Sequence, residues 1–85
     1  TLKDVETRLL NWILRRCPSP DGTSPVEVRL PGTKRALAGE LGTVSETFSR
    51  TLAKLRAQQL IEVKGSVLHV PSPARLAQVM RRNLG

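Results

Sequence analysis

The feature that most constrains the fold is a pair of amphipathic segments separated only by a short turn that contains Gly42. Thr33 is a suitable N-cap for a first helix that continues through Leu41. Leu37 and Leu41 would face inward, and Gly42 would end the helix because glycine adopts the left-handed backbone conformation readily. The first half of this unit is therefore predicted as a short helix over residues 33–41.

The second half of the unit begins with Thr43-Val44-Ser45-Glu46, which matches a capping box. In that pattern Thr43 is the N-cap and Glu46 is the third helical residue. The helix is predicted to continue to about Gln59. Two helices joined by so short a turn cannot lie parallel, and this arrangement is typical of a helix-turn-helix.

A hairpin follows directly after the second helix. Residues 61–64 and 67–70 are joined by a two-residue Gly65-Ser66 turn, which fixes their register. The predicted pairs are Lys64 with Val67, Val63 with Leu68, Glu62 with His69, and Ile61 with Val70. This register places Ile61, Val63, Leu68 and Val70 on one apolar face. A hairpin in this position is a wing.

The chain before the helix-turn-helix is predicted as a helix, a loop and a strand. The helix covers residues 3–16, with one side formed by Val5, Leu9, Trp12, Ile13 and Arg16. Leu10 and Leu14 widen the apolar surface, either for packing against the C-terminal segment or for contact with a missing domain. The loop over residues 17–25 contains three prolines and a glycine. Residues 26–30 then alternate as a half-buried strand that ends at Pro31.

The C-terminal segment is predicted as a final helix. Ser72 would cap it and Pro73 would occupy its first position. Leu76, Val79 and Met80 would face inward. The predicted fold is therefore α+β, a winged helix-turn-helix in the order helix, strand, helix, helix, hairpin, helix with a small antiparallel sheet. Residues 1–85 are expected to form a single domain, which at this length has room for one core and no enclosed substrate cavity.

The charge balance points to a polyanionic partner. Fourteen Lys and Arg residues against seven Asp and Glu residues give a net charge of +7. Such a basic small domain is typical of proteins that bind nucleic acid or a membrane surface. No stretch is long and apolar enough to span a membrane, and of the two polyanions nucleic acid is the expected partner, with no membrane partner. The chain has one Trp, one Phe and no Tyr, which argues against readers of single strands that stack bases on aromatic rings.

The sequence contains no candidate for catalysis or metal binding. His69 is the only histidine, and it is predicted to face Glu62 across the hairpin. Cys17 lies in the proline-rich loop. Because it is the only cysteine, the chain cannot form an internal disulfide or a cysteine metal site. We therefore expect neither an enzyme nor a cofactor in this domain. Because the chain opens with Thr1 and not Met, it is expected to be a fragment of a longer protein.

The second helix of the motif carries the strongest functional signal. On a helical wheel Val44, Leu52 and Leu55 lie around Phe48 and define a buried stripe. The opposite side carries Glu46, Arg50, Ala53 and Ala57. Arg can donate two hydrogen bonds to guanine, and a carboxylate can accept one from cytosine. The alternatives are that Glu46 only caps the helix, or that it forms an ordinary surface ion pair with Arg50.

Two sets of residues are the candidate DNA contacts. Those predicted to read bases are Ser45, Glu46, Ser49 and Arg50. Those predicted to contact phosphates are Thr33, Lys34, Arg35, Thr43, Thr47, Lys54, Lys64 and Ser66. For each of the second set, the alternative is a charged or polar group that is merely solvated.

The chain resembles the C-terminal domain of the Crp/Fnr superfamily. The resemblance is carried by the pattern LA-x-x-LG-x-x-x-ET-x-SR-x-L-x-x-L, which begins at Leu37, and it extends to the wing. It implies a cytoplasmic bacterial transcription regulator whose sensor barrel and dimerisation helix would precede Thr1. It also implies full-length homodimers that bind inverted repeats and position RNA polymerase, and a monomeric state for this fragment.

The resemblance also implies a half-site. Glu46, Ser49 and Arg50 match the E-x-x-S-R residues of the Fnr/Dnr branch, which recognises TTGAT-type half-sites. The cyclic-AMP receptor branch has Gly in place of Ser49 and Arg in place of Ser45, and it reads TGTGA. Ser45 matches neither branch well, which leaves the outer base of the half-site open. A winged helix used only for contact between proteins is the alternative function.

Overall fold

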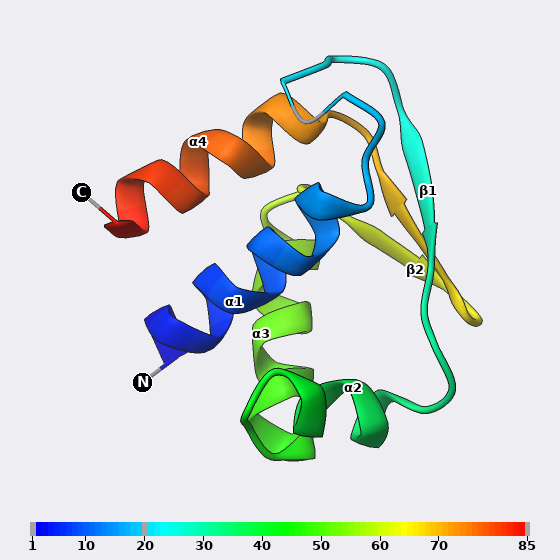
Figure 1. Cartoon of the computed structure of the whole chain (residues 1–85), viewed down its shortest axis with the longest axis vertical. Coiled ribbons are helices and arrows are strands. Elements are labelled where there is room, and N and C mark those ends of the chain that lie inside the picture. Colours follow the sequence, from blue (N-terminus) through cyan, green and yellow to red (C-terminus); the bar gives the residue numbers. More distant parts are fainter. Residues whose placement is uncertain (1, 20, 85) are drawn as a thin grey trace.

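The structure, a computed structural model, describes residues 2–19 and 21–84 (Figure 1). Its elements are α1 (Leu2–Arg15), β1 (Val26–Arg29), α2 (Lys34–Glu40), α3 (Ser45–Ala57), β2 (Glu62–Lys64), β3 (Val67–Val70) and α4 (Pro73–Leu84). The predicted α+β class, order of elements and small antiparallel sheet are confirmed. Thr1 and Gly85, at the ends of the predicted domain, and Pro20, in the predicted loop, lie outside the described residues.

The sheet has three strands in the order β1-β3-β2. The predicted hairpin register is confirmed for Glu62 with His69, Val63 with Leu68 and Lys64 with Val67. The ladder does not extend to the predicted pair of Ile61 with Val70, because β2 begins at Glu62; Val70 pairs with Val26 of β1 on the other side of β3. Leu68 and Val70 are fully buried, so the apolar face of the hairpin covers the core as predicted.

The core lies between the sheet and the helices, and α1 packs along α4 (Figure 1). Leu10 and Leu14 of α1 are both buried within this single domain. Leu76 of α4 is also fully buried, while Val79 and Met80 are half-buried against the core. Packing against the C-terminal segment therefore accounts for the wide apolar surface of α1.

Arg16 departs from the predicted helix. The helix ends at Arg15, and Arg16 is exposed instead of lying on the buried side. Its guanidinium group stacks 3.7 Å from the centre of the Trp12 ring and donates a hydrogen bond of 3.0 Å to the Trp12 carbonyl. A guanidinium over the face of a tryptophan is an attractive cation–π contact. Arg16 thus covers the buried Trp12 from the solvent side.

The turn between α2 and α3 is a Schellman motif. Gly42 has a φ of +74°, and its N–H donates to the Gly39 carbonyl at 3.0 Å. The Thr43 N–H donates to the Ala38 carbonyl at 2.9 Å. These are the two hydrogen bonds that define this helix end. The predicted role of Gly42 as the end of the first helix is confirmed.

The same motif displaces the predicted capping box. Because Thr43 completes the end of α2, the N-cap of α3 is Val44, which has an extended backbone and no side-chain cap hydrogen bond. The prediction that Thr43 caps α3 is therefore wrong. The prediction that Val44 joins the buried stripe is also wrong, since it is 64% exposed. A wheel applies only to helical residues, and Val44 is not helical.

A second Schellman motif ends α3, two residues before the predicted end. The Gln59 N–H donates to the Arg56 carbonyl and the Leu60 N–H to the Leu55 carbonyl, at 2.9 and 3.0 Å. Gln59 has a φ of +59°, a conformation that glycine adopts at lower cost. The sharp change of direction leads the chain straight into β2.

Candidate nucleic-acid interface

The outward side of α3 presents all four residues predicted to read bases. Phe48, Leu52 and Leu55 are buried and fix the orientation of the helix. The opposite side therefore faces solvent, and the predicted base-reading residues on it are all exposed: Ser45, Glu46, Ser49 and Arg50. Ala53 and Ala57 are exposed on the same side and add no bulk.

Glu46 and Arg50 form an ion pair one helical turn apart. The Arg50 Nη2 atom donates to Glu46 Oε1 at 2.6 Å. The side chain of Glu46 is 74% exposed and that of Arg50 is 68% exposed, so solvent reaches both groups. Since Thr43 does not cap α3, the carboxylate of Glu46 is directed along the helix surface to Arg50. The pair is therefore accessible on the outward side of α3.

The N-terminus of α2 carries three further predicted residues. Thr33 is the N-cap, and its Oγ1 atom accepts a hydrogen bond of 3.1 Å from the Ala36 N–H. Lys34 and Arg35 are exposed in the first turn. Arg35 lines a hollow of about 600 Å³ with Ser45 and Glu46, so α2 brings a cation next to the start of α3.

The start of α3 also lies beside α1. Thr43 and Thr47 are half-buried here and line a hollow of about 340 Å³ together with Arg8 and Arg50. Arg8 donates a hydrogen bond of 3.1 Å to the carbonyl of Leu41 in the turn. Sequence reasoning missed Arg8, because 33 residues separate it from its partner and no local pattern marks such a contact.

The wing lies beside the other flank of α3. Lys64 and Ser66 are exposed near the turn of the hairpin, where Gly65 has a φ of +60°. A groove of about 550 Å³ separates α3 from β2, and Arg56 and Lys64 both line it. Arg56 was not predicted as a DNA contact, because the helical wheel drew attention only to Glu46, Arg50 and the alanines on the outward side. Its sequence signal is a cation in the last turn of α3.

Lys54 differs from the other predicted phosphate contacts. Its Nζ atom lies 2.7 Å from Oε2 of Glu6, whose side chain is 4% exposed. The other oxygen of Glu6 accepts a hydrogen bond of 3.0 Å from Asn83. Lys54 is therefore part of a polar contact that joins α3 to α1 and α4. Glu6 has a sequence signal, since it interrupts the apolar side of α1 between Val5 and Leu9.

The remaining chemically active groups have structural surroundings. His69 lies between Glu27 and Glu62 in the sheet register. Cys17 is buried, its Sγ atom donates to the Ile13 carbonyl at 3.4 Å, and burial raises the pKa of its thiol. Among the residues that the structure describes, no cluster of His, Cys, Asp and Glu could hold a metal ion. Nor is any helix in this part of the chain long and apolar enough to cross a membrane.

The chain that carries this exposed helix matches a known protein family. The family model of the Crp-like helix-turn-helix domain matches residues 7–79. The chain belongs to this family. It is therefore a DNA-binding helix-turn-helix domain of the Crp/Fnr type, which is a non-enzymatic family of transcription regulators.

Curated relatives of this Crp-like domain are bacterial regulators. The fumarate and nitrate reduction regulatory protein of Escherichia coli strain K12 is 34% identical over 79 residues, which cover 91% of this chain and 32% of the relative. The global nitrogen regulator of Synechococcus elongatus is 31% identical over 81 residues, covering 89% and 35%. The chain spans about a third of the length of these relatives.

Solved structures share the fold of the Crp-like domain. A Ruegeria pomeroyi protein described as a candidate cyclic nucleotide binding protein aligns with a TM-score of 0.79 at 28% identity, covering 91% of this chain and 33% of that one. Reduced, ligand-free CprK aligns with a TM-score of 0.71 at 20% identity, covering 88% and 37%. The resemblance that the sequence indicated is confirmed, and so is the winged helix-turn-helix fold.

Proposed function

We propose that this domain reads TTGAT-type half-sites in double-stranded DNA by inserting α3 into the major groove. The observation that carries the proposal is the exposed Glu46–Arg50 pair on the outward side of α3. Arg50 would donate two hydrogen bonds to guanine O6 and N7, and Glu46 would accept one from cytosine N4. Ser49 would distinguish this half-site from TGTGA, and Ser45 would lie near the outer base. The exposed alanines of α3 leave room for the groove walls.

Phosphate contacts would surround the inserted helix. Two sets of polar and basic side chains support this arrangement. One set lies on α2, the turn after it and the first turn of α3, and the other lies on the wing. The proposed phosphate contacts are Thr33, Lys34, Arg35, Thr43, Thr47, Lys64 and Ser66. We leave Lys54 out of this set, because its ammonium group pairs with the buried carboxylate of Glu6. We add Arg56 to the proposed phosphate contacts, because it lines the groove beside the wing.

The test of base reading is selection from random duplexes followed by an Arg50→Ala variant. We expect TTGAT to be enriched. The variant should lose about 1–3 kcal/mol of binding free energy on that site and much less on random DNA. Enrichment of TGTGA would overturn the half-site. Equal weakening on every sequence would overturn the role of Arg50, and the absence of any enriched motif would favour a winged helix used for protein contact.

Phosphate contacts are tested by the salt dependence of binding. Lys34→Ala and Lys64→Ala should each weaken binding to all duplexes alike and reduce the slope of log K against log salt by about one. The exposed Arg81 of α4, which lies outside the proposed contacts, supplies the control Arg81→Ala. A change in base preference in either lysine variant would contradict a phosphate contact.

We further propose that residues 1–85 act as one domain of a cytoplasmic bacterial regulator that forms homodimers and contacts RNA polymerase. The support is the similarity to bacterial regulators about three times as long as the aligned segment. The domain alone should sediment as a monomer at micromolar concentration and bind one half-site weakly. A tight dimer of the isolated domain would contradict this assignment.

A further inference from the structure

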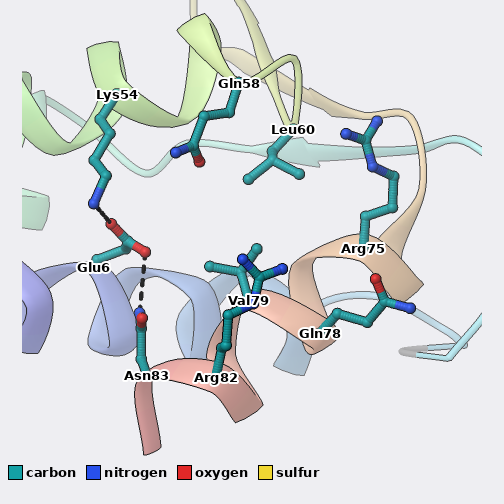
Figure 2. A pocket seen from close by; sticks show the side chains of 9 residues that line it. All are labelled: Glu6, Lys54, Gln58, Leu60, Arg75, Gln78, Val79, Arg82 and Asn83. Carbon is teal, nitrogen blue, oxygen red and sulfur yellow. Dashed lines mark hydrogen bonds and ion pairs between the residues drawn. The ribbon is translucent and has the colours of Figure 1, made fainter.

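A hollow of about 400 Å³ lies between α1, the C-terminal half of α3 and α4 (Figure 2). Most side chains that line it can donate hydrogen bonds, among them Lys54 of α3, the C-cap residue Gln58, and Arg75, Gln78 and Arg82 of α4. The hollow lies on a different side of α3 from the groove beside the wing, which is lined by Ala53, Arg56 and Ala57. It is thus separate from the proposed base-reading surface, and phosphate binding in it does not depend on the reading of bases.

The charges around this hollow do not balance. Its lining contains three cations, Lys54, Arg75 and Arg82, and a single carboxylate, that of Glu6. The Glu6 carboxylate is already engaged by Lys54 at 2.7 Å and by Asn83 at 3.0 Å. Within the part of the chain that the structure describes, the side chains of Arg75 and Arg82 form no hydrogen bond or ion pair. The hollow therefore presents two guanidinium groups without an anion.

The two arginines share one face of α4. Seven residues separate them, which corresponds to about 10.5 Å along a helix. Figure 2 shows both guanidinium groups extending from α4 toward the wall formed by Gln58 and Leu60. Guanidinium groups are planar donors whose geometry matches the oxygens of phosphate. The amide of Gln58 supplies a further donor on the α3 side of this space.

We propose that this hollow binds a phosphate group through Arg75 and Arg82, with the amide of Gln58 as an additional donor. The phosphate would belong either to a small molecule or to a DNA backbone beyond the half-site. Lys54 does not bind it directly but keeps Glu6 neutralised, so that no free negative charge faces the anion. A bound phosphate would also bridge α4 to the end of α3.

The test is a titration of the 85-residue chain with inorganic phosphate, at constant ionic strength, followed by NMR chemical shifts. We expect saturable shifts confined to Gln58 and to the α4 residues around the hollow. Arg75→Gln and Arg82→Gln should each weaken binding about tenfold, as expected for loss of a charge-assisted hydrogen bond. Arg81→Gln is the matched control, because Arg81 is exposed on the same helix but does not line the hollow. It should change the affinity less than about twofold.

Several outcomes would overturn the proposal. These are shifts that never saturate, shifts spread evenly over the basic surface, or equal weakening by Arg81→Gln and Arg82→Gln. Thermal unfolding followed by the single tryptophan, Trp12, checks that each variant is folded.

A second titration distinguishes the two sources of phosphate. If the complex with a saturating duplex still binds inorganic phosphate with the same affinity, the ligand is a small phosphate-bearing molecule. If the duplex blocks phosphate and Arg82→Gln lowers the salt slope of duplex binding by about one, the ligand is the DNA backbone.

Discussion

The first two turns of α3 and its last two turns differ in what holds their side chains. At the start, Val44 is exposed and provides no side-chain cap, and Glu46 and Arg50 contact only each other in solvent. Toward the end, Leu55 is fully buried and Lys54 pairs with the buried Glu6. Phe48 and Leu55 anchor both halves of α3 in the core, but among the described residues only the C-terminal half adds a polar contact with a buried partner. The polar contact that holds α3 against α1 and the residues proposed to read DNA thus lie in different turns of one helix, and substitutions can test that division.

The largest expected effect is loss of the apolar anchor. Leu55→Ala should lower the free energy of unfolding by about 2–5 kcal/mol, because it leaves a cavity under the C-terminal half of α3. Val44→Ala, at the exposed start, should change it by less than about 0.5 kcal/mol. Chemical denaturation followed by Trp12 fluorescence measures both. Similar losses for the two variants would contradict the division.

The polar anchor should have the next largest effect. Lys54→Ala should lower the free energy of unfolding by about 1–3 kcal/mol, because Glu6 is then left buried without its cation. Arg56→Ala removes an exposed cation in the same turn and serves as the control. Adding Glu6→Gln to Lys54→Ala should recover part of the loss, since a neutral amide is easier to bury. A double variant no more stable than Lys54→Ala would show that the pair is not what anchors the helix.

A missing cap offers a gain in stability at the other end. Val44→Ser should raise the free energy of unfolding by about 1 kcal/mol, because a hydroxyl at the N-cap can accept from a free N–H of the first turn. Val44→Ala has no such oxygen and controls for the loss of the valine side chain. Equal stability of the Ser and Ala variants in denaturation would mean that the start of α3 has no unmet need for a cap.

The smallest effect is expected for the exposed ion pair. Glu46→Gln should lower the free energy of unfolding by only about 0.2–0.5 kcal/mol at low salt, as for other surface pairs one turn apart. The difference should shrink in 1 M salt, where such charges are screened. Ser49→Ala is the matched control on the same face. A loss above about 1 kcal/mol would assign Glu46 a structural role beyond its contact with Arg50.

Local patterns were sufficient for much of the fold and for the exposed side of α3. The Gly65-Ser66 turn fixed the hairpin register, and the spacing of Phe48, Leu52 and Leu55 fixed which side of the helix is buried. Both depend on neighbours within a few residues. The capping box failed because two local motifs compete for Thr43. The Schellman motif of α2 uses its N–H, which moves the start of α3 by one residue.

Contacts between distant segments could not be derived from those patterns. The pairing of β1 with β3, the bond from Arg8 to Leu41 and the pair of Lys54 with Glu6 each join residues far apart in the chain. Tertiary packing brings these residues together, of β1 against β3 and of α1 against α3 and the turn before it. Lys54 was predicted as a phosphate contact because the sequence does not show that its side of α3 packs against α1.

The position of β1 also bears on how the chain folds. β2 and β3 are neighbours in sequence, whereas Val26 of β1 pairs with Val70, and the whole helix-turn-helix lies between them. Closing so long a loop costs chain entropy before any ladder hydrogen bond is gained. We expect the hairpin and the helix pair to form first and β1 to dock last. Hydrogen exchange should then find β1 the first strand to open, with the wing keeping its shape until the helices beneath it separate.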